Sequence, residues 1–316
     1  MKRALQLFNF LLIALASLPF ALLPLRLSVK TGEAMGSLLY YFWKSRRLIA
    51  IENLRSAVSR EAITLASTPE ELIKLNFRIL GKSFVEIVKI YYGRGEEIIR
   101  EVEIKGAENF KKAQAKGAGV IFISGHCGNW ELTGIALSQK LSSIQGIARQ
   151  LDNPYLNNHI ELVRKKYGNS VIYKKGALKK ILLALRDNRT VGILMDQSVV
   201  RSEGVIAEFL GKRARIMKIP AIIARKTGAP VLPVFIKRQK NGHLIEIQEE
   251  IQLDTAEDYD NAVYNDTVNF ARRIEEYIRN NPAEWLWIHR RWKKIKEDQC
   301  SVTQVSKNDI MHQEVI

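Results

Sequence analysis

The sequence predicts an α/β fold in which a largely parallel central sheet is flanked by helices. Between residues 100 and 253, short apolar runs bounded by glycine or polar residues alternate with stretches of helical pattern. Continuous apolar runs of this length are typical of strands buried on both faces, and their alternation with helices favours a parallel sheet. Before residue 96 the pattern is helical, and it begins with an apolar stretch at the N-terminus.

The composition of the chain limits its class. The 316 residues are 47% hydrophobic and 26% charged, so the chain is globular and long enough for a sizeable core. A formal net charge of +16 favours a polyanionic partner, such as nucleic acid, an anionic membrane surface or a phosphorylated substrate. Cys127 and Cys300 are too few and too far apart for a disulfide framework or a zinc site, and they suit a reducing compartment.

The N-terminal stretch has no charged residue from position 4 to position 25. A helix of about 20 apolar residues crosses a bilayer, although Pro19 and Pro24 weaken the second half of this one. A cleaved secretory signal and a helix lying in the membrane interface fit the same pattern. We expect a retained anchor, either spanning or half-buried. Arg26 and Lys30 follow it and predict that the body of the protein is cytoplasmic.

The other elements follow from periodicity and from glycine positions. Apolar residues in 70–92 recur at helical spacing, and 107–117 fits a short amphipathic helix. We expect strands at 100–106, 118–124, 142–149, 170–173, 190–197 and 229–238, an edge strand at 243–253, and helices at 155–167, 176–188, 217–228 and 261–280. The predicted organisation is therefore a membrane anchor at 1–30, a helical segment at 31–95, the main α/β domain at 96–296 and a polar, flexible tail at 297–316.

A histidine between two glycine positions, His126, directly follows the predicted strand 118–124. Functional groups of α/β sheets gather at the carboxyl ends of strands. Asn129 is a good N-cap, which places Glu131 in the first turn of the next helix. On one continuous helix this spacing would leave the two side chains about 140° apart, so His126 must lie in the turn to meet Glu131. We expect that contact, because the carboxylate would then accept one ring N–H and leave the other nitrogen as a general base.

A histidine–glutamate pair without an enzyme nucleophile suits deprotonation of a substrate hydroxyl that attacks an acyl donor directly. Two other classes compete with this interpretation. Cys127 could be the nucleophile of a Cys–His hydrolase, although in an extended turn it would point away from His126. The chain could instead be a basic module without catalysis. Tryptophans mixed with basic residues at 285–296 fit nucleic acid or a membrane interface, and the apolar N-terminus favours the membrane.

The motif at 124–132 resembles the His-x4-Asp/Glu signature of the glycerolipid acyltransferase superfamily, in the Glu form of the bacterial lipid A biosynthesis acyltransferases. This short signature is weak by itself. The resemblance continues in family order at 148–168, 192–197, 208–235 and 281–293. The departures are mild and consist of Gln150, Leu151, Glu284 and Trp292 at positions where the family commonly has other residues.

The resemblance implies an acyltransferase in which His126 is the general base, Glu131 orients it and Arg164 stabilises the oxyanion, with Arg149 as the second candidate for that role. The residues expected to bind or support the substrate are Arg149, Asn153, Asp196, Gln197, Phe209, Gly211 and Lys218, with Arg213 and Arg215 as further candidates for phosphate contacts. No metal or other cofactor is implied, and no nucleic-acid partner is expected.

The same resemblance implies the partners. The donor would be a thioester of acyl carrier protein or coenzyme A, and the acceptor a hydroxyl of a phosphorylated glycolipid, a lipid A precursor. The enzyme would work at the cytoplasmic face of the bacterial inner membrane. A phosphatidylinositol mannoside or a lysophospholipid is the alternative acceptor, because relatives that acylate such lipids share much of the pattern.

Overall fold

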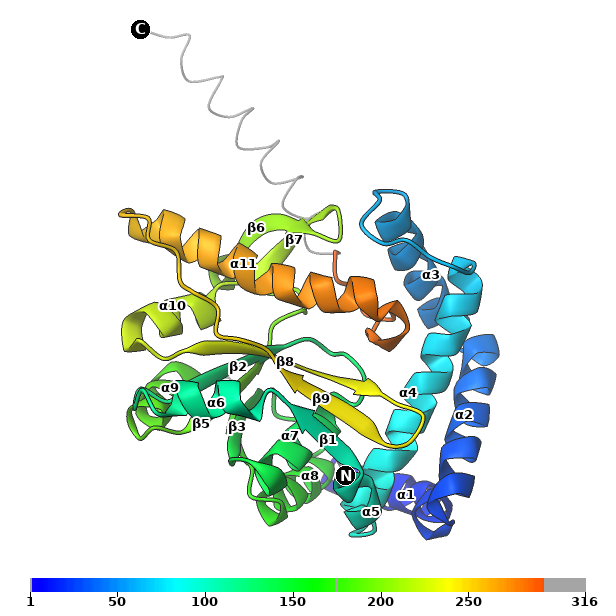
Figure 1. The fold of residues 1–316 in the computed structure, drawn as a ribbon. Helices are drawn as coiled ribbons and strands as arrows, with labels where there is room; N and C mark the ends of the chain where they lie inside the picture. Colours follow the sequence, from blue (N-terminus) through cyan, green and yellow to red (C-terminus); the bar gives the residue numbers. More distant parts are fainter. Residues whose placement is uncertain (1, 174–175, 293–316) are drawn as a thin grey trace, which may run out of the picture.

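The computed structural model describes residues 2–173 and 176–292, and its centre is a seven-stranded sheet in the order β1-β9-β8-β2-β5-β3-β4 (Figure 1). Its strands are β1 (Val102–Lys105), β2 (Val120–Ser124), β3 (Ile144–Ala148), β4 (Ser170–Tyr173), β5 (Thr190–Leu194), β8 (Val231–Arg238) and β9 (His243–Ile247). All neighbouring pairs are parallel except β8 with β9. The predicted α/β class with a largely parallel sheet is therefore confirmed.

Strand β9 is not the edge strand that its alternating sequence predicts. It turns back from β8 through Gly242, whose φ is +72°, and it lies between β8 and β1. His243, Ile245 and Ile247 are buried, whereas Leu244 and Glu246 are only partly buried. The alternating sequence thus reflects that one face of the strand is more deeply buried than the other. It says nothing about how many strands pair with it.

A separate two-stranded sheet, made of β6 (Gly204–Phe209) and β7 (Lys212–Met217), contains two residues that were expected to bind or support the substrate, Phe209 in β6 and Gly211 in the turn. The strands are antiparallel and joined by a two-residue turn in which Leu210 and Gly211 have φ of +51° and +71°. Two successive residues of positive φ are typical of the tight turns that match the twist of a hairpin. Gly211 therefore serves this turn.

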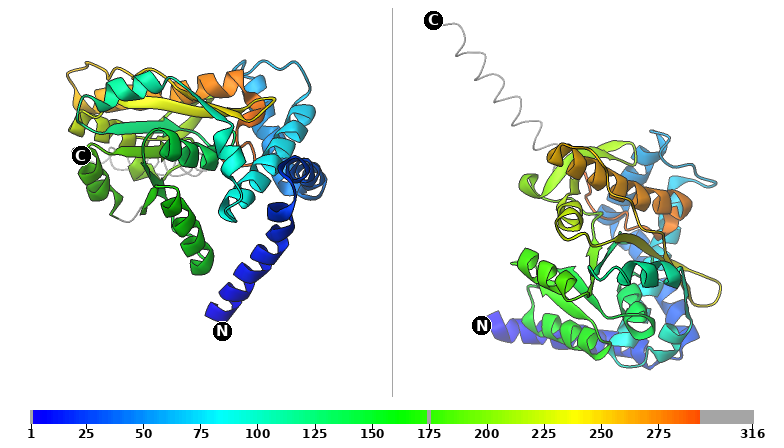
Figure 2. Two further views of the ribbon diagram at one scale, coloured as in Figure 1. Left: turned by 60° about the horizontal axis from the view of Figure 1, so that its bottom comes forward. Right: turned by 60° about the vertical axis from the view of Figure 1, so that its left-hand side comes forward.

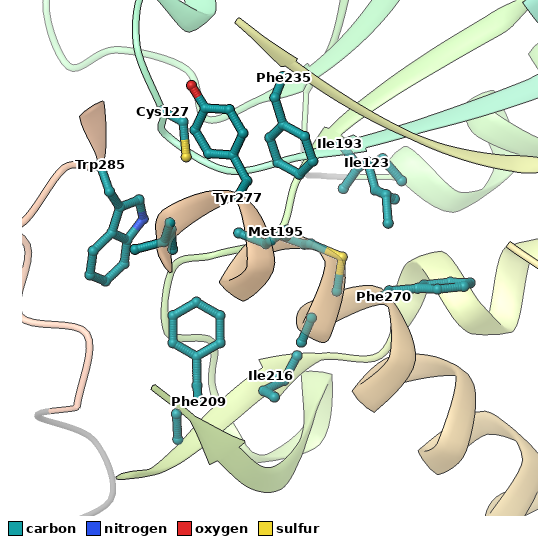
Figure 3. Close-up of a cluster of buried hydrophobic side chains, with 14 of the residues drawn as sticks. Ile123, Cys127, Ile193, Met195, Phe209, Ile216, Phe235, Phe270, Tyr277 and Trp285 are labelled. Carbon is teal, nitrogen blue, oxygen red and sulfur yellow. The ribbon is translucent and has the colours of Figure 1, made fainter. Parts of the chain in front are cut away.

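Helices cover both faces of the large sheet. They are α6 (Ala107–Gln114), α7 (Trp130–Lys140), α8 (Pro154–Lys166), α9 (Ala177–Arg186), α10 (Ile219–Thr227) and α11 (Tyr259–Asn280). The α11 helix, orange in Figure 1, crosses one face and packs Phe270 and Ile274 into a core that also holds Ile123 (Figure 3). Phe122, the next residue back along β2, belongs to the core on the opposite face. The uninterrupted apolar sequence of β2 follows from this burial on both faces.

The N-terminal third is helical, with α1 (Lys2–Leu22), α2 (Leu25–Phe42), α3 (Lys44–Val58), α4 (Pro69–Tyr91) and α5 (Glu96–Arg100). Position 30, the expected end of the anchor, lies inside α2. The α2 and α4 helices cross closely, since a Cβ atom on Gly36 would lie 2.1 Å from the carbonyl oxygen of Phe77. The tail expected at 297–316 and Cys300 lie outside the described residues.

The first helix, α1, projects from the body (Figure 2), and its hydropathy and length are those of a membrane-crossing segment. Only 11% of its most apolar window is buried. Its N-terminal half contacts α8, where the Asn153 side chain donates to the carbonyl of Gln6 over 2.8 Å and the Phe10 ring stacks on Tyr155. An exposed apolar helix that is held against the body fits association with a membrane.

Candidate active site

The turn that follows β2 carries His126 and is built by its glycines and by the next helix. Gly128 has a φ of +55°, and a Cβ atom there would lie 2.4 Å from the carbonyl oxygen of Ile236. Only glycine fits such a close approach without displacement of the neighbouring backbone. The Asn129 side chain accepts from the N–H of Leu132 and caps α7, as the sequence predicts. The chain therefore turns sharply and leaves the imidazole at the carboxyl end of the sheet.

Asp196 holds the imidazole. Its Oδ1 lies 2.7 Å from His126 Nδ1, while Oδ2 accepts from the backbone N–H of His126 and from the Trp285 indole N–H, each over 2.8 Å. Asp196 follows β5, which pairs in parallel with β2, so the two strands end side by side. Burial by itself would raise the pKa of Asp196. The charge and hydrogen bonds of His126 and the bond from Trp285 outweigh it and lower that pKa to about 2.

The second ring nitrogen, Nε2, lies 3.1 Å from the side-chain nitrogen of Gln197. An ionised Asp196 accepts the N–H of Nδ1. Nε2 of the same ring therefore carries no proton and accepts a hydrogen bond from Gln197. The structure thus brings His126, Asp196 and Gln197 together. Asp196 and Gln197 were expected among the substrate-binding or supporting residues, and their position against the imidazole ring is decided by the pairing of β5 with β2.

Glu131 does not make the expected contact with His126. Both of its carboxylate oxygens bind Arg164, at 2.7 Å to Nε and 2.8 Å to Nη2, and Oε1 also accepts from the Tyr91 hydroxyl. The expectation was wrong because the first turn of α7 directs Glu131 toward α8 and α4, where a bidentate guanidinium satisfies it. Burial would lower the pKa of Arg164, but the Glu131 carboxylate outweighs that effect and raises it.

An apolar cavity of about 150 Å³ lies between α7, α8 and the sheet. Glu131 and Arg164 line it together with Trp130, whose ring centroid is 5.2 Å from that of His126. Most of its other wall residues are apolar, and they include Phe122, Gly134, Ile135, Leu137, Ile144, Gly146, Ile147, Val171, Gly192, Ile193, Leu194 and Val234. A Cβ atom built on Gly146 would meet nothing within 4 Å. The absence of a side chain at Gly146 therefore contributes to the open space.

Several residues expected to bind substrate lie elsewhere. Asn153 caps α8 by accepting from the N–H groups of Tyr155 and Leu156, so its structural role is that of an N-cap. The Arg149 side chain is largely exposed and pairs with Asp152, although it lines a shallow hollow next to Arg164. Lys218 directly precedes α10. Among the described residues, none of these three side chains is hydrogen-bonded to His126 or Asp196.

Phe209 and the tryptophans of 285–292 were expected to face substrate or membrane, and both expectations were wrong. Phe209 is 1% exposed, and Trp285, Trp287 and Trp292 are 2%, 0% and 7% exposed. Their rings pack together, with centroids 5.9 Å apart for Phe209 and Trp285 (Figure 3). Mixed aromatic and basic composition cannot separate a membrane belt from an aromatic core, because both use tryptophan for its large apolar surface.

Comparison with known proteins identifies the family to which the chain belongs. A model described as bacterial lipid A biosynthesis acyltransferase matches residues 2–294. The chain belongs to this family. The acyltransferase is 26% identical over 270 residues to the lipid A biosynthesis palmitoleoyltransferase of Escherichia coli (strain K12), with 83% of each chain covered.

Two other relatives differ in the lipid that they are named for. The acyltransferase is 25% identical to the lipid A biosynthesis lauroyltransferase of Escherichia coli (strain K12), over 87% of this chain and 88% of that protein. It is 24% identical to the phosphatidylinositol mannoside acyltransferase of Mycobacterium tuberculosis (strain CDC 1551 / Oshkosh), over 76% of this chain and 77% of that protein.

Cys127 of the acyltransferase is buried, and replacing it tests the hydrolase alternative. The side chain is 1% exposed in the core below the turn (Figure 3). Burial, together with the Asp196 and Glu284 charges, raises the pKa of the thiol well above its ordinary value, so the reactive thiolate is disfavoured. We expect Cys127→Ser to keep acyl transfer within about threefold while it lowers the free energy of unfolding by about 1–3 kcal/mol, since a hydroxyl is buried there. Complete loss of activity in a folded variant would favour a cysteine nucleophile.

Proposed function

We propose that this acyltransferase moves a fatty acyl chain from a thioester of acyl carrier protein or coenzyme A to a hydroxyl of a lipid A precursor. The observation that carries the proposal is the imidazole of His126, held by Asp196 at 2.7 Å beside an apolar cavity. A neutral imidazole whose Nδ1–H is fixed by a carboxylate is suited to accept a proton at Nε2. The cavity supplies a place for the acyl chain.

The reaction would proceed as follows. Nε2 of His126 takes the proton of the acceptor hydroxyl as the oxygen attacks the thioester carbonyl carbon, and a tetrahedral oxyanion forms. The oxyanion then collapses, the carbon–sulfur bond breaks, and the departing sulfur takes the proton from the imidazolium. The products are an ester and the free thiol of the carrier. Asp196 stabilises the imidazolium, because it accepts the Nδ1–H throughout.

Arg164 is the proposed electrostatic group, and Glu131 positions it. Nε and Nη2 of Arg164 are bound to Glu131, and Tyr91 fixes the same carboxylate over 2.8 Å. In this proposal Nη1 is the donor to the oxyanion, and it acts without the entropy cost of ordering a free arginine. We infer that the glutamate of the His-x4-Glu motif acts here through Arg164, and that the motif's histidine is oriented by Asp196.

The cavity supports an acyl-chain site, and filling it should shorten the accepted chain. Gly146 on β3 faces open space, and its backbone is not in the left-handed region. We expect Gly146→Leu to favour shorter donors. If two methylene groups lose their place, each worth about 0.8 kcal/mol, the preference between donors should change roughly tenfold. Competition between donors of different length, read by mass spectrometry of the product, measures this, and Gly146→Ala should give a smaller change in the same direction.

Exposed apolar side chains on α1, α8 and α9 support work at a membrane. Leu162 on α8 is 65% exposed, Leu178 on α9 is 43% exposed, and α1 adds Leu15 at 69%. Exposed apolar surface on neighbouring elements, such as α1 and α8, is typical of a membrane or protein contact. We infer that the α1–α8 side of the molecule meets the inner membrane from the cytoplasm, where a lipid acceptor would be presented.

Product analysis tests the proposal. The purified full-length protein is incubated with acyl carrier protein or coenzyme A thioesters and, separately, with a lipid A precursor, a phosphatidylinositol mannoside and a lysophospholipid. Mass spectrometry of the lipids should reveal an acylated lipid A precursor. Transfer to the mannoside alone would show that the lipid A precursor is not the acceptor. Hydrolysis of the thioester without transfer to any acceptor would overturn the proposal. Under-acylated lipid A in a deletion strain would support the same acceptor in the cell.

A further inference from the structure

Residues 282–289, which we term the clamp segment, hold the catalytic turn through its backbone. The N–H of Leu286 donates to the carbonyl of His126 over 3.0 Å, and the N–H of Gly128 donates to the carbonyl of Glu284 over 2.8 Å. These bonds lie on both sides of Cys127, which forms a β-bridge with Trp285. The turn that presents the general base is therefore paired with a chain segment more than 150 positions later in the sequence.

The clamp segment is itself fixed by the N-terminal helices. The Asn76 side chain on α4 donates to the carbonyls of Ala283 and Trp285, both over 2.7 Å. The Asn53 side chain on α3 donates to the carbonyls of Trp287 and His289, both over 2.9 Å. Asn76 is fully buried, so its bonds are protected from competition by water. The helical segment before the α/β domain thus determines where the clamp segment lies.

Trp285 adds a side-chain contact to the carboxylate that holds the base. Its indole N–H donates to Asp196 Oδ2 over 2.8 Å, and the ring is 2% exposed. Phe209 and Trp287 pack on the ring with centroids at 5.9 and 4.6 Å. An indole nitrogen is a donor only, so it can bind a carboxylate oxygen and cannot bind a protonated Nδ1. The indole N–H therefore occupies Oδ2 and leaves Oδ1 directed at His126.

We propose that Trp285 is a positioning residue for acyl transfer. It fixes the rotation of the Asp196 carboxylate, so that Oδ1 accepts the Nδ1–H of His126 and Nε2 carries no proton and can take that of the acceptor. This inference rests on the proposed function for its kinetic consequence. The effect on the imidazole tautomer does not depend on which substrate the enzyme uses.

Trp285→Phe keeps a buried ring and removes the donor. We expect kcat to fall roughly tenfold, as for loss of one hydrogen bond to a charged group, while KM changes little because Trp285 does not line the cavity. The ¹⁵N spectrum of the His126 ring, recorded without substrate, should show that part of the Nδ1–H form has changed to the Nε2–H form. A benzothienylalanine at position 285 keeps the shape of indole without its N–H, and it serves if the phenylalanine variant does not fold.

Trp287→Phe is the matched control. Trp287 is 0% exposed in the same aromatic cluster, and its N–H donates to the carbonyl of Pro282 over 2.7 Å. We expect this variant to lose comparable stability and to keep both kcat and the ring tautomer. Equal losses of kcat in the two variants, or an unchanged tautomer and kcat at position 285, would overturn the inference. If Trp285→Phe changes the ring tautomer but the wild-type enzyme transfers no acyl group, the positioning role stands and the proposed function is rejected.

Discussion

His126→Ala is expected to lower kcat for acyl transfer by about three orders of magnitude, because general-base catalysis typically contributes 10²–10⁴-fold. Among the described residues, the imidazole of His126 is the base that is hydrogen-bonded to Asp196, and its Nε2 is directed away from that carboxylate. KM should change much less, because the acyl cavity is lined by other residues. Steady-state kinetics with a thioester donor, followed by the release of free thiol, measures both quantities.

Folding controls decide whether this loss is chemical. Removing the imidazole leaves Asp196 with the backbone N–H of residue 126 and the Trp285 indole as donors, so the carboxylate stays partly satisfied. We therefore expect the variant to fold, to bind vesicles as the wild-type protein does and to lose no more than about 1–2 kcal/mol of stability. His126→Gln should be equally inactive. Activity within tenfold of wild type in either folded variant would remove His126 from the mechanism.

Asp196→Asn should lower kcat by two to four orders of magnitude, roughly the range seen when a carboxylate that orients a catalytic histidine is replaced. Oδ2 accepts two N–H donors in the wild-type protein, from His126 and Trp285. In the variant, the amide oxygen is expected to take the position of Oδ2, because that position accepts these two donors. The amide NH₂ then points toward Nδ1 of the His126 ring. Nδ1 must then be an acceptor, and the proton moves to Nε2, the nitrogen that the reaction needs as a base.

The ring tautomer of His126 and a matched variant check this reasoning. Asp266→Asn alters another buried aspartate, which is 1% exposed, binds Arg225 over 2.6 Å and accepts from the N–H of Asp254. This control should lose stability and keep kcat within a few-fold, with an unchanged His126 spectrum. If Asp196→Asn is inactive but its ¹⁵N spectrum retains the Nδ1–H form, the tautomer explanation is wrong.

Asp196 also makes stability depend on pH in a defined window. Its pKa in the folded protein, about 2, lies below the ordinary value of 3.8, so the ionised carboxylate stabilises the fold. This contribution is complete above about pH 4 and is lost as the pH falls toward the lower value. Asp196→Asn lacks it at every pH, so its stability should depend less steeply on pH between about 4 and 2.

The positions of the strand before His126, of its turn and of the following helix could be predicted from the sequence. The run at 118–124 is apolar at successive positions because both faces of β2 are buried, and Asn129 has the chemistry of an N-cap. The spacing of His126 and Glu131 was informative about the turn. It could not predict the hydrogen-bond partners of these two side chains. A spacing of five allows several directions for the Glu131 carboxylate, and it carries no information about groups on β5 or α8.

Long-range pairing decided the rest of the site. Asp196 meets His126 because β5 lies beside β2, and Arg164 meets Glu131 because α8 packs next to α7. Trp285 reaches the same carboxylate from the end of the chain. Local sequence determines where strands, caps and turns begin and end, since these depend on neighbouring residues. The choice of partner for a buried carboxylate depends on which groups the folded chain places within about 3 Å of it, and only the tertiary structure contains that information.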